Sequence, residues 1–424
     1  MALAVAVTPF LWFQKDTNAN HFSGHIPVDP RLYHDHQRTD HKQRPEKEIQ
    51  PSSDVTPSGN SWAFSTIQAY PDLGLDHLGD EAIEFNSNNI QAMIRLKLEF
   101  IIQARLTRAR KQRRKMEDDF VFHGHSFEGK PRPLFVTLSV PGGGLGNYMF
   151  MVATLVGVAR KNNRIPILMY PDHRANYFEG LALEVTAETN LYPNRNLTDD
   201  DLMFEAACSW YLNDTANLST TKFANRTVAL RGYLQSFMYF DEFREEIRTM
   251  FTFKEHTLNA AKDAILQGIQ GLDNTSTALH NQTKVPTLVG IHVRRGDILH
   301  DPHKAHGQTP ATEQYLLRTA LRYQRKYAPV LFIVISNDIA YCREVFVDDH
   351  FVFISGTPLE VDMAIMTLMD QMIMSVGSYS FWGAYLNGQA TDISYFRDWP
   401  RPGSDLARIT NKSEYFLPSW HGRI

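Results

Sequence analysis

The stretch GIHVRRGD, Gly290 to Asp297, decides the fold class of this chain. It closes an apolar run from Thr287 to Val293, bounded by Pro286 and Gly296, which is typical of a buried strand. Charge at the end of a buried strand costs free energy unless something binds there. In open α/β sheets, ligands bind beyond the carboxyl ends of the strands. Two adjacent guanidiniums, each permanently charged and carrying a fork of donors, suit a pyrophosphate.

Composition limits the class of protein. The 424 residues allow about two to three domains. A net charge of −4 argues against nucleic acid as the main partner. The two cysteines, Cys208 and Cys342, could pair or stay free, and two do not make a disulfide scaffold.

Seven Asn-x-Ser/Thr sequons indicate a lumenal or secreted protein, because these tripeptides accept N-glycans. Chance gives roughly two or three in a chain of this length. The asparagines are Asn196, Asn213, Asn217, Asn225, Asn274, Asn281 and Asn411. An Asn- and Thr-rich chain without glycans is the alternative.

The amino-terminal segments carry weaker signals. Met1 to Phe13 is apolar but shorter than the roughly 20 residues of a membrane helix, so a signal-type core fits better than an anchor, unless the anchor's start is missing. The histidine-rich stretch 14–79 matches no zinc spacing and is expected to be a solvated linker.

A helical pattern from Asp80 to Asp119 ends in a basic run between Arg105 and Lys115. We expect a solvated helical stem with cations near its C-terminus, and a nuclear signal or nucleic-acid arm is the alternative.

The pattern of the sequence changes at Pro131. A strand over Leu134–Val140, a glycine-rich turn, a helix from Met149 to Ala159 and a strand over Ile165–Met169 form a strand–loop–helix–strand unit, the start of a parallel sheet. The turn places backbone donors near a helix start, where anions bind well. Its glycine spacing departs from the dinucleotide fingerprint, so a purely structural turn is the alternative.

The same alternation returns later. Strands are expected at Leu288–Val293, Val330–Ser336, Phe351–Ile354 and Ile373–Val376, and helices at Thr312–Tyr327, Val361–Met369 and from near Phe381. Two α/β domains with a cleft between them is the simplest architecture.

Three strand ends carry ligand-type chemistry, and together they predict a nucleotide diphosphate site. Carboxylates and amides can contact a base or ribose, arginines neutralise the pyrophosphate, and small hydroxyl residues complete a phosphate cradle. The residues are His292, Arg294, Arg295 and Asp297, then Asn337 and Asp338, then Ser375, Ser378 and Ser380. Ordinary helix capping by Ser336 and Ser380 is the alternative. We expect no metal, because Asp199 and Asp201 suit a helix N-terminus and no strand pattern leads into them.

These residues carry a family resemblance. The chain resembles the α-1,2-fucosyltransferases that add fucose to galactosides, glycosyltransferase family 11. The matching blocks are Gly143–Asn147, Arg231–Ser236, Gly290–Asp297, Ser336–Asp338 and Asp362–Leu386, in the family's order. Two departures stand out: Tyr148 replaces the usual Gln, and no full membrane helix is visible.

The resemblance implies an α/β fold of the GT-B-like type, with two Rossmann-like domains facing a cleft and preceded by a stem region. We divide the chain into 1–130 (apolar segment and stem), 131–284 (acceptor side) and 285–424 (GDP-fucose-binding domain). The resemblance also implies that the donor is GDP-fucose, that the acceptor is a β-galactoside-terminated glycan, that the sugar carbon inverts, and that no metal is required. The family's usual place is the Golgi lumen, with a type II membrane anchor.

Site roles follow. Arg295 is expected on the β-phosphate, where its charge stabilises the leaving GDP. The alternative for Arg294 is a role in local structure, since adjacent strand residues point to opposite faces. His292 supports the donor pocket, with Gly144, Gly146 and Asn147 at the first loop. Asp297 is the candidate general base, or else it orients the arginines.

Two other functions stay open at this level. One is a fucosyltransferase of another linkage, α-1,6 or peptide O-fucosylation, which shares an arginine motif after a strand. The other is an inactive GDP-sugar or glycan-binding homologue, which Tyr148 favours.

Overall fold

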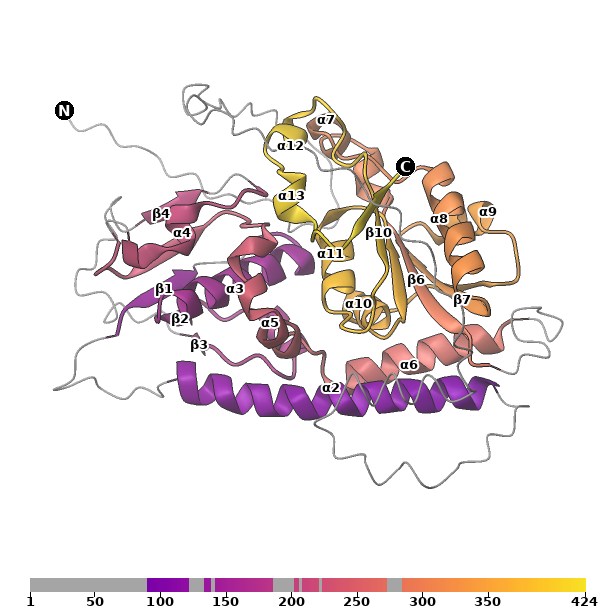
Figure 1. Ribbon diagram of the computed structural model, residues 1–424, viewed down its shortest axis with the longest axis horizontal. Coiled ribbons are helices and arrows are strands. Elements are labelled where there is room, and N and C mark those ends of the chain that lie inside the picture. Colours follow the sequence, from indigo (N-terminus) through magenta and orange to yellow (C-terminus); the bar gives the residue numbers. More distant parts are fainter. Residues whose placement is uncertain are drawn as a thin grey trace, which may run out of the picture. The chain divides into compact units, whose positions relative to one another are not determined.

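The structure is a computed structural model that describes residues 90–121, 133–138, 142–185, 202–205, 208–220, 223–272 and 284–424 (Figure 1). Every described residue belongs to one compact unit, Ala69–Ile424. The apolar start, the linker and Asp199–Asp201 lie outside the described residues.

The first sheet is built around the glycine-rich turn. Its strands, all parallel, are β1 (Phe135–Leu138), β2 (Ile165–Leu168), β3 (Glu184–Val185), β4 (Leu202–Glu205) and β5 (Val228–Arg231), in the order β3-β2-β1-β5-β4. Helix α3 (Leu145–Lys161) joins β1 to β2, with Gly144 as its N-cap. The predicted strand–loop–helix–strand unit is therefore confirmed.

The second sheet is also parallel, with the order β11-β10-β9-β6-β7-β8. Its strands are β6 (Thr287–Val293), β7 (Val330–Ser336), β8 (Phe351–Ile354), β9 (Gln371–Met374), β10 (Ile393–Phe396) and β11 (His421–Arg423). Two parallel sheets confirm the α/β class predicted from the sequence. Because every strand runs the same way, the carboxyl ends of β6, β7 and β9 meet at one edge.

Helices join these strands. They are α8 (Glu313–Lys326), α9 (Ile339–Val345), α10 (Leu359–Thr367) and α11 (Gly377–Tyr385), with α5 (Arg244–Met250) and α6 (Glu255–Gln270) before the sheet. Short helices are α4 (Asn213–Ala216), α7 (His303–His306), α12 (Asp405–Arg408) and α13 (Lys412–Tyr415). In Figure 1, α8 and α9 lie on one side of the sheet and α10 and α11 on the other. The chain adds β7 and β8 on one side of β6, and after β8 it returns to add β9, β10 and β11 on the other side. Because crossovers between parallel strands are right-handed, this reversal places the later helices on the opposite face of the sheet.

Two predicted boundaries were wrong in the region after α10. Strand β9 is Gln371–Met374, two residues before the predicted strand, and α11 begins at Gly377, not near Phe381. Gly377 has a φ of +85°, which turns the chain sharply into the helix. A residue with a side chain rarely adopts this conformation, so the turn depends on glycine.

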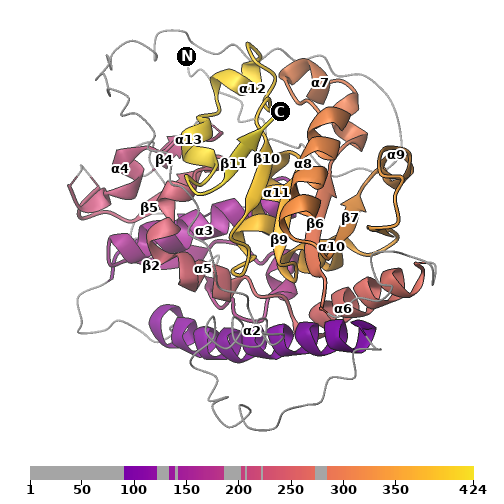
Figure 2. The same ribbon diagram turned by 45° about the vertical axis from the view of Figure 1, so that its right-hand side comes forward.

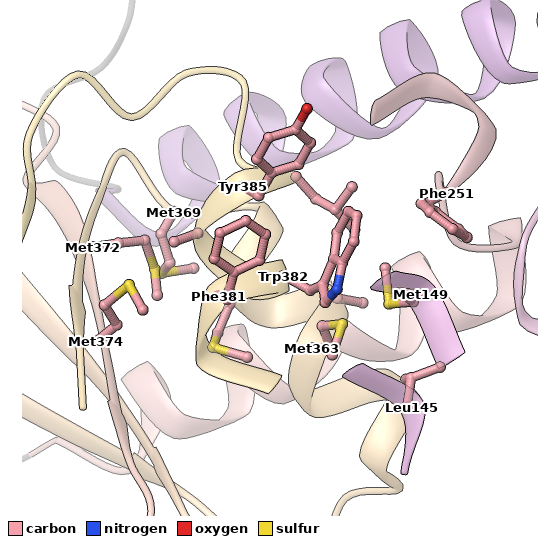
Figure 3. Close-up of a cluster of buried hydrophobic side chains, with 14 of the residues drawn as sticks. Leu145, Met149, Phe251, Met363, Met369, Met372, Met374, Phe381, Trp382 and Tyr385 are labelled. Carbon is pink, nitrogen blue, oxygen red and sulfur yellow. The ribbon is translucent and has the colours of Figure 1, made fainter. Parts of the chain in front are cut away.

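The two sheets share one hydrophobic core. Figure 3 shows Phe381 and Trp382 of α11 among Met149 of α3, Phe251 and several methionines of the second sheet. The Trp382 ring meets the Phe251 ring edge-on, with centroids 5.2 Å apart. Such aromatic pairs add specificity to the burial itself. The helices that follow β1 and β9 are thus packed directly together.

Helix α2 (Ile90–Phe120) corrects the expectation of a solvated stem. Its apolar face, including Ile94, Leu98 and Ile101, is fully buried, and it packs against α5 and α6 (Figure 2). Amphipathic spacing revealed the helix, but it could not show which surface would cover the apolar stripe.

The basic run of α2 is used within the fold. Arg105 donates to the Thr367 carbonyl at 2.7 Å, at the end of α10. Arg113 donates to the Leu181 carbonyl at 3.0 Å, beside the first sheet. Helix α2 therefore bridges both halves of the core, and these cations bind protein groups.

Two further observations bear on the sequence expectations. Cys208 and Cys342 are both free thiols, so they do not pair. Within the described ranges, no helix has the length and apolar character needed to cross a bilayer.

Candidate nucleotide-sugar site

The three predicted clusters meet at the carboxyl edge of the second sheet. The backbone N–H of Arg294, directly after β6, donates to Ser375 Oγ at 2.9 Å. The next N–H, of Arg295, donates to Asn337 Oδ1 at 2.8 Å. The side chains that follow β9 and β7 thus fix the backbone of the arginine turn from both sides. These contacts are made within the protein, and donor binding by Ser375 and Asn337 stays a prediction.

Arg295 is held at one end and open at the other. Its Nε donates to Asp338 Oδ2 at 3.0 Å, and its guanidinium carbon lies 3.6 Å from the centroid of the Tyr341 ring. Asp338 is fixed in turn, since its Oδ1 caps α9 by accepting from the Tyr341 N–H. The terminal amines of Arg295 have no hydrogen-bond partner among the described residues, so this fork is oriented and available to an anion.

Arg294 lies across the start of α11. A Cβ built on Gly377 would come within 2.8 Å of Arg294 Nη1, so a side chain at this position would push the guanidinium aside. Arg294 Nη2 donates to Asp297 Oδ2 at 2.8 Å. The structure therefore places Asp297 as the partner of an arginine, on a carboxylate that is 41% exposed. Its role as general base stays a prediction.

His292 is a buried, neutral part of the site. It is 6% exposed, and its Nδ1 lies 2.5 Å from Ser380 Oγ. Burial, with the charge of Arg294, lowers the pKa of His292 to about 3. Ser380 is fully buried as well. His292 and Ser380 form a buried pair next to the arginine turn. Direct contact between Ser380 and the donor stays a prediction.

The glycine-rich loop is anchored by a pair that the sequence argument missed. Arg174 Nη1 donates to the Gly143 carbonyl at 2.6 Å, and Asp172 Oδ2 pairs with Arg174 Nη2 at 2.5 Å. The helix η4 (His173–Tyr177) carries Arg174. Both residues follow strand β2, so the strand-end argument applied to Arg294 could have found them.

Tyr148, the departure from the family pattern, is packed inside. It is fully buried, and the Arg174 guanidinium lies 4.7 Å from its ring centroid. Among the residues the structure describes, its hydroxyl has no hydrogen-bond partner. Burial raises the pKa of that hydroxyl. Tyr148 therefore occupies the buried side of the first turn of α3.

The start of α3, after the glycine-rich loop, contacts the start of α11 directly. A Cβ on Gly146 would lie 2.6 Å from the Ser378 carbonyl carbon, so the starts of α3 and α11 are in backbone contact. Ser378 Oγ donates to Asn147 Oδ1 at 2.7 Å. The predicted donor residues Gly144, Gly146, Asn147 and Ser378 thus lie at one junction.

Asp362 is a further acidic group near this junction. Its carboxylate accepts a hydrogen bond from the Thr357 hydroxyl, and burial raises the pKa of Asp362 to about 6. Burial, with the nearby charge of Asp362, also raises the pKa of Tyr379, whose ring centroid lies 5.2 Å from that of His292. A perturbed carboxyl beside a ligand-type cluster is a typical site feature. Sequence reasoning included Asp362 only as the first residue of a family block.

Metal-ligand geometry occurs elsewhere. In the described part of the chain, one cluster offers three ligand atoms within 4.8 Å of one another: Asp348, Asp349 and His350. It directly precedes β8, at the amino edge of the sheet, away from the arginines.

An oriented arginine fork, two helix starts in contact and flanking carboxylates lie at the carboxyl edge of a parallel sheet, where ligands of α/β proteins bind. The family model "Glycosyl transferase family 11" matches residues 136–423. The chain belongs to this family, and the resemblance drawn from its sequence blocks is confirmed.

Curated relatives match about two thirds of the chain. A galactoside alpha-(1,2)-fucosyltransferase 2 of Gorilla gorilla gorilla is 30% identical over 289 residues, 66% of this chain and 77% of the relative. The galactoside 2-alpha-L-fucosyltransferase Sec1 of Mus musculus is 28% identical over 301 residues, 69% of this chain and 74% of the relative.

Solved structures are more distant. A mutant Arabidopsis thaliana FUT1 in complex with GDP has a TM-score of 0.37 and 13% identity, with 67% of this chain and 73% of that chain covered. The fucosyltransferase NodZ from Bradyrhizobium has a TM-score of 0.36 and 12% identity, with 60% and 93% covered. At these scores neither contributes to the argument.

Proposed function

We propose that this protein is a galactoside 2-α-L-fucosyltransferase, which moves L-fucose from GDP-fucose to the 2-hydroxyl of a terminal β-galactoside. The observation that carries the proposal is the Arg295 fork, fixed by Asp338 and Tyr341 with its terminal amines open. Membership of glycosyl transferase family 11 and relatives named galactoside alpha-(1,2)-fucosyltransferases support it.

The reaction is a single displacement with inversion. The acceptor oxygen bonds to the anomeric carbon of fucose as the bond from that carbon to the β-phosphate oxygen breaks. The leaving GDP gains negative charge, which Arg295 and Arg294 stabilise without a metal. The acceptor proton passes to a base, for which Asp297 is the candidate, and its ion pair with Arg294 would couple proton uptake to the donor side.

We propose a lumenal, Golgi-type location with an amino-terminal membrane anchor. The seven sequons support exposure to the glycosylation machinery, and Asn213 and Asn225 are exposed on the fold. Endoglycosidase treatment of the cell-made protein should increase its gel mobility, and carbonate extraction should leave it in the membrane pellet. Unchanged mobility, or release into the supernatant, contradicts the corresponding half of the proposal.

The test of activity is an acceptor screen. Purified protein, GDP-fucose and galactosides such as lactose are incubated with EDTA, GDP release is measured, and the product linkage is read by NMR. An α-1,2-linked product in EDTA supports the proposal. A product of another linkage identifies a different fucosyltransferase, and donor binding without transfer to any acceptor identifies a binding protein.

A further inference from the structure

One side-chain oxygen joins three distant segments at the junction of the two sheets. Asn147 Oδ1 accepts from Gln235 Nε2 at 2.9 Å and from Ser378 Oγ at 2.7 Å. Asn147 lies in the first turn of α3, Gln235 follows β5, and Ser378 lies at the start of α11, the helix after β9 of the second sheet. The side-chain amide of Asn147 therefore links the glycine-rich loop to α11.

Gln235 is itself held rigidly. It is 7% exposed, its backbone N–H donates to the Cys208 carbonyl at 2.9 Å, and its Oε1 accepts from the Cys208 thiol at 3.5 Å. Burial raises the pKa of Cys208 to about 11, so the thiol stays protonated and remains a donor. With Oε1 occupied by a donor, the amide presents its N–H to Asn147.

The junction has little free space. Gly146 touches the backbone of Ser378 and Tyr379, so the two helix starts cannot move closer. Arg294 lies against Gly377, the first residue of α11. A shift of α11 relative to the loop therefore displaces the surface against which Arg294 lies. In close-packed interiors such shifts are transmitted to neighbouring groups.

We propose that Gln235 is a positioning residue for fucosyl transfer: through Asn147 and Ser378 it holds the glycine-rich loop of the first sheet in register with the start of α11 beside the arginine pair. Gln235 itself touches no reacting atom in this account. The inference rests on the proposed function, because the arginine pair is taken as the donor site.

The test replaces Gln235 by Met, which keeps the length and removes both hydrogen-bonding atoms. We expect kcat to fall roughly tenfold to a hundredfold, the cost of slightly misplaced reacting groups. Affinity for GDP, measured by calorimetry, should change by less than about threefold, since the arginine contacts stay. Gln235→Glu should recover part of kcat, because the Asn147 amide can turn over and donate to the new carboxylate and to Ser378.

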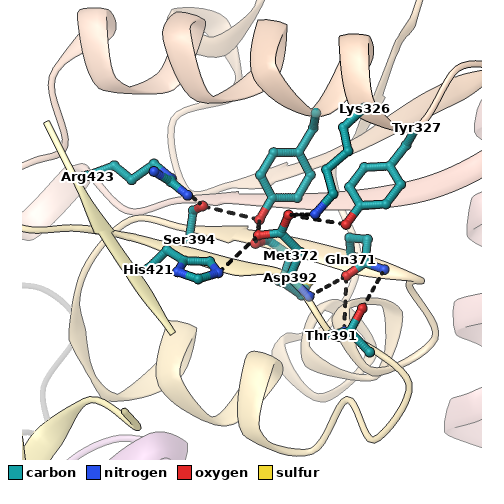
Figure 4. A network of polar contacts seen from close by, with 10 residues as sticks. Lys326, Tyr327, Gln371, Met372, Thr391, Asp392, Ser394, His421 and Arg423 are labelled. Carbon is teal, nitrogen blue, oxygen red and sulfur yellow. Dashed lines mark hydrogen bonds and ion pairs between the residues drawn. The ribbon is translucent and has the colours of Figure 1, made fainter. Parts of the chain in front are cut away.

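Gln371 offers a matched control. It is also buried, and its Oε1 accepts from the N–H groups of Thr391 and Asp392 at 3.1 and 2.7 Å, at the amino edge of the sheet (Figure 4). Gln371→Met should lower thermal stability and leave kcat of the folded enzyme unchanged. If both variants lose stability and neither loses kcat, Gln235 is merely structural and the proposal is overturned.

A second measurement does not depend on activity. Hydrogen exchange should become faster in Gln235→Met at both 144–147 and 377–380, although these segments begin two helices that follow strands of different sheets. The control variant should leave both unchanged. Faster exchange in the loop alone, with 377–380 still protected, would overturn the coupling. If the wild-type protein fails to fucosylate any galactoside but both segments respond, the proposed function fails and the coupling stands.

Discussion

The guanidinium carbon of Arg295 lies over the ring of Tyr341, 3.6 Å from its centroid, while Asp338 accepts a hydrogen bond from its Nε. Ring and carboxylate together orient a long side chain before a ligand arrives, which reduces the ordering cost of binding. Tyr341 is on α9 and carries no charge that a phosphate would recognise, so its contribution is orientation.

This relationship predicts a graded series at Tyr341. Tyr341→Leu removes the ring under Arg295 and should weaken GDP binding by about fivefold to thirtyfold, the value of one cation–π contact of about 1–2 kcal/mol. Tyr341→Phe keeps the ring and should bind GDP like the wild type. Calorimetric titration with GDP measures both. Equal affinities of the Leu variant and the wild type would show that the ring does not orient the arginine.

His292 should make the fold less stable in acid. Its folded-state pKa of about 3 lies below the usual value near 6.5, so the unfolded chain binds more protons between these two pH values. The stabilisation is present above the unfolded pKa and is lost as pH falls. From pH 7 to pH 5 the contribution to the free energy of unfolding should decrease by about 2 kcal/mol.

Urea unfolding at the two pH values tests this. His292→Gln should be less stable than the wild type at pH 7, and it should lose less stability on acidification. If wild type and variant lose equal amounts between pH 7 and pH 5, the histidine is not held neutral.

Asp362 should act in the opposite direction. Burial raises its folded-state pKa to about 6, above the value in the unfolded chain, so its neutral form favours folding. That stability is fully present below the unfolded pKa and is lost as pH rises through about 6. Asp362→Asn should therefore gain melting temperature relative to the wild type on moving from pH 5 to pH 7.5. A constant difference between the two melting curves would contradict the raised pKa.

Helix α2 should be part of the folding unit, although the family match begins later, at residue 136. Lys97 pairs with Asp370 at 2.5 Å, with side chains 8% and 19% exposed, and Asp370 Oδ2 also accepts the Leu288 N–H at the start of β6. Lys97→Met should destabilise by about 2–4 kcal/mol, because it leaves a partly buried carboxylate without its cation.

Lys111→Met, on the exposed side of the same helix, is the control and should be within about 0.5 kcal/mol of the wild type. Denaturant unfolding measures the free energy of unfolding of both variants and the wild type. Equal stability of both would mean that α2 is a dispensable stem after all.

The strands of the second sheet could be predicted from the sequence more accurately than the start of α11 or the burial of α2. Strands β7 and β8 have the predicted bounds because continuous apolar runs end at polar residues. The start of α11 was missed because a single positive φ at Gly377 shortens the turn. The burial of α2 was missed because apolar spacing reveals a stripe but not its partner.

The site shows the same division. The strand-end argument brought Arg295, Asn337 and Ser375 together correctly, since parallel strands deliver their ends to one edge. It did not find Gln235, whose function is a contact between segments far apart in the chain, and no local pattern encodes such a pairing. Its only signal was its place in a family block, Arg231–Ser236.

The central claim is that the oriented Arg295 fork carries fucosyl transfer by stabilising departing GDP. The most direct measurement is fucose transfer from GDP-fucose to a lactose acceptor in EDTA, by wild type, Arg295→Lys and Arg295→Ala, with folding checked by melting temperature. We predict transfer by the wild type, no detectable transfer by Arg295→Ala, and at least a hundredfold loss in Arg295→Lys, because a point charge cannot replace the fork. Undiminished transfer by a folded Arg295→Ala variant would contradict the account.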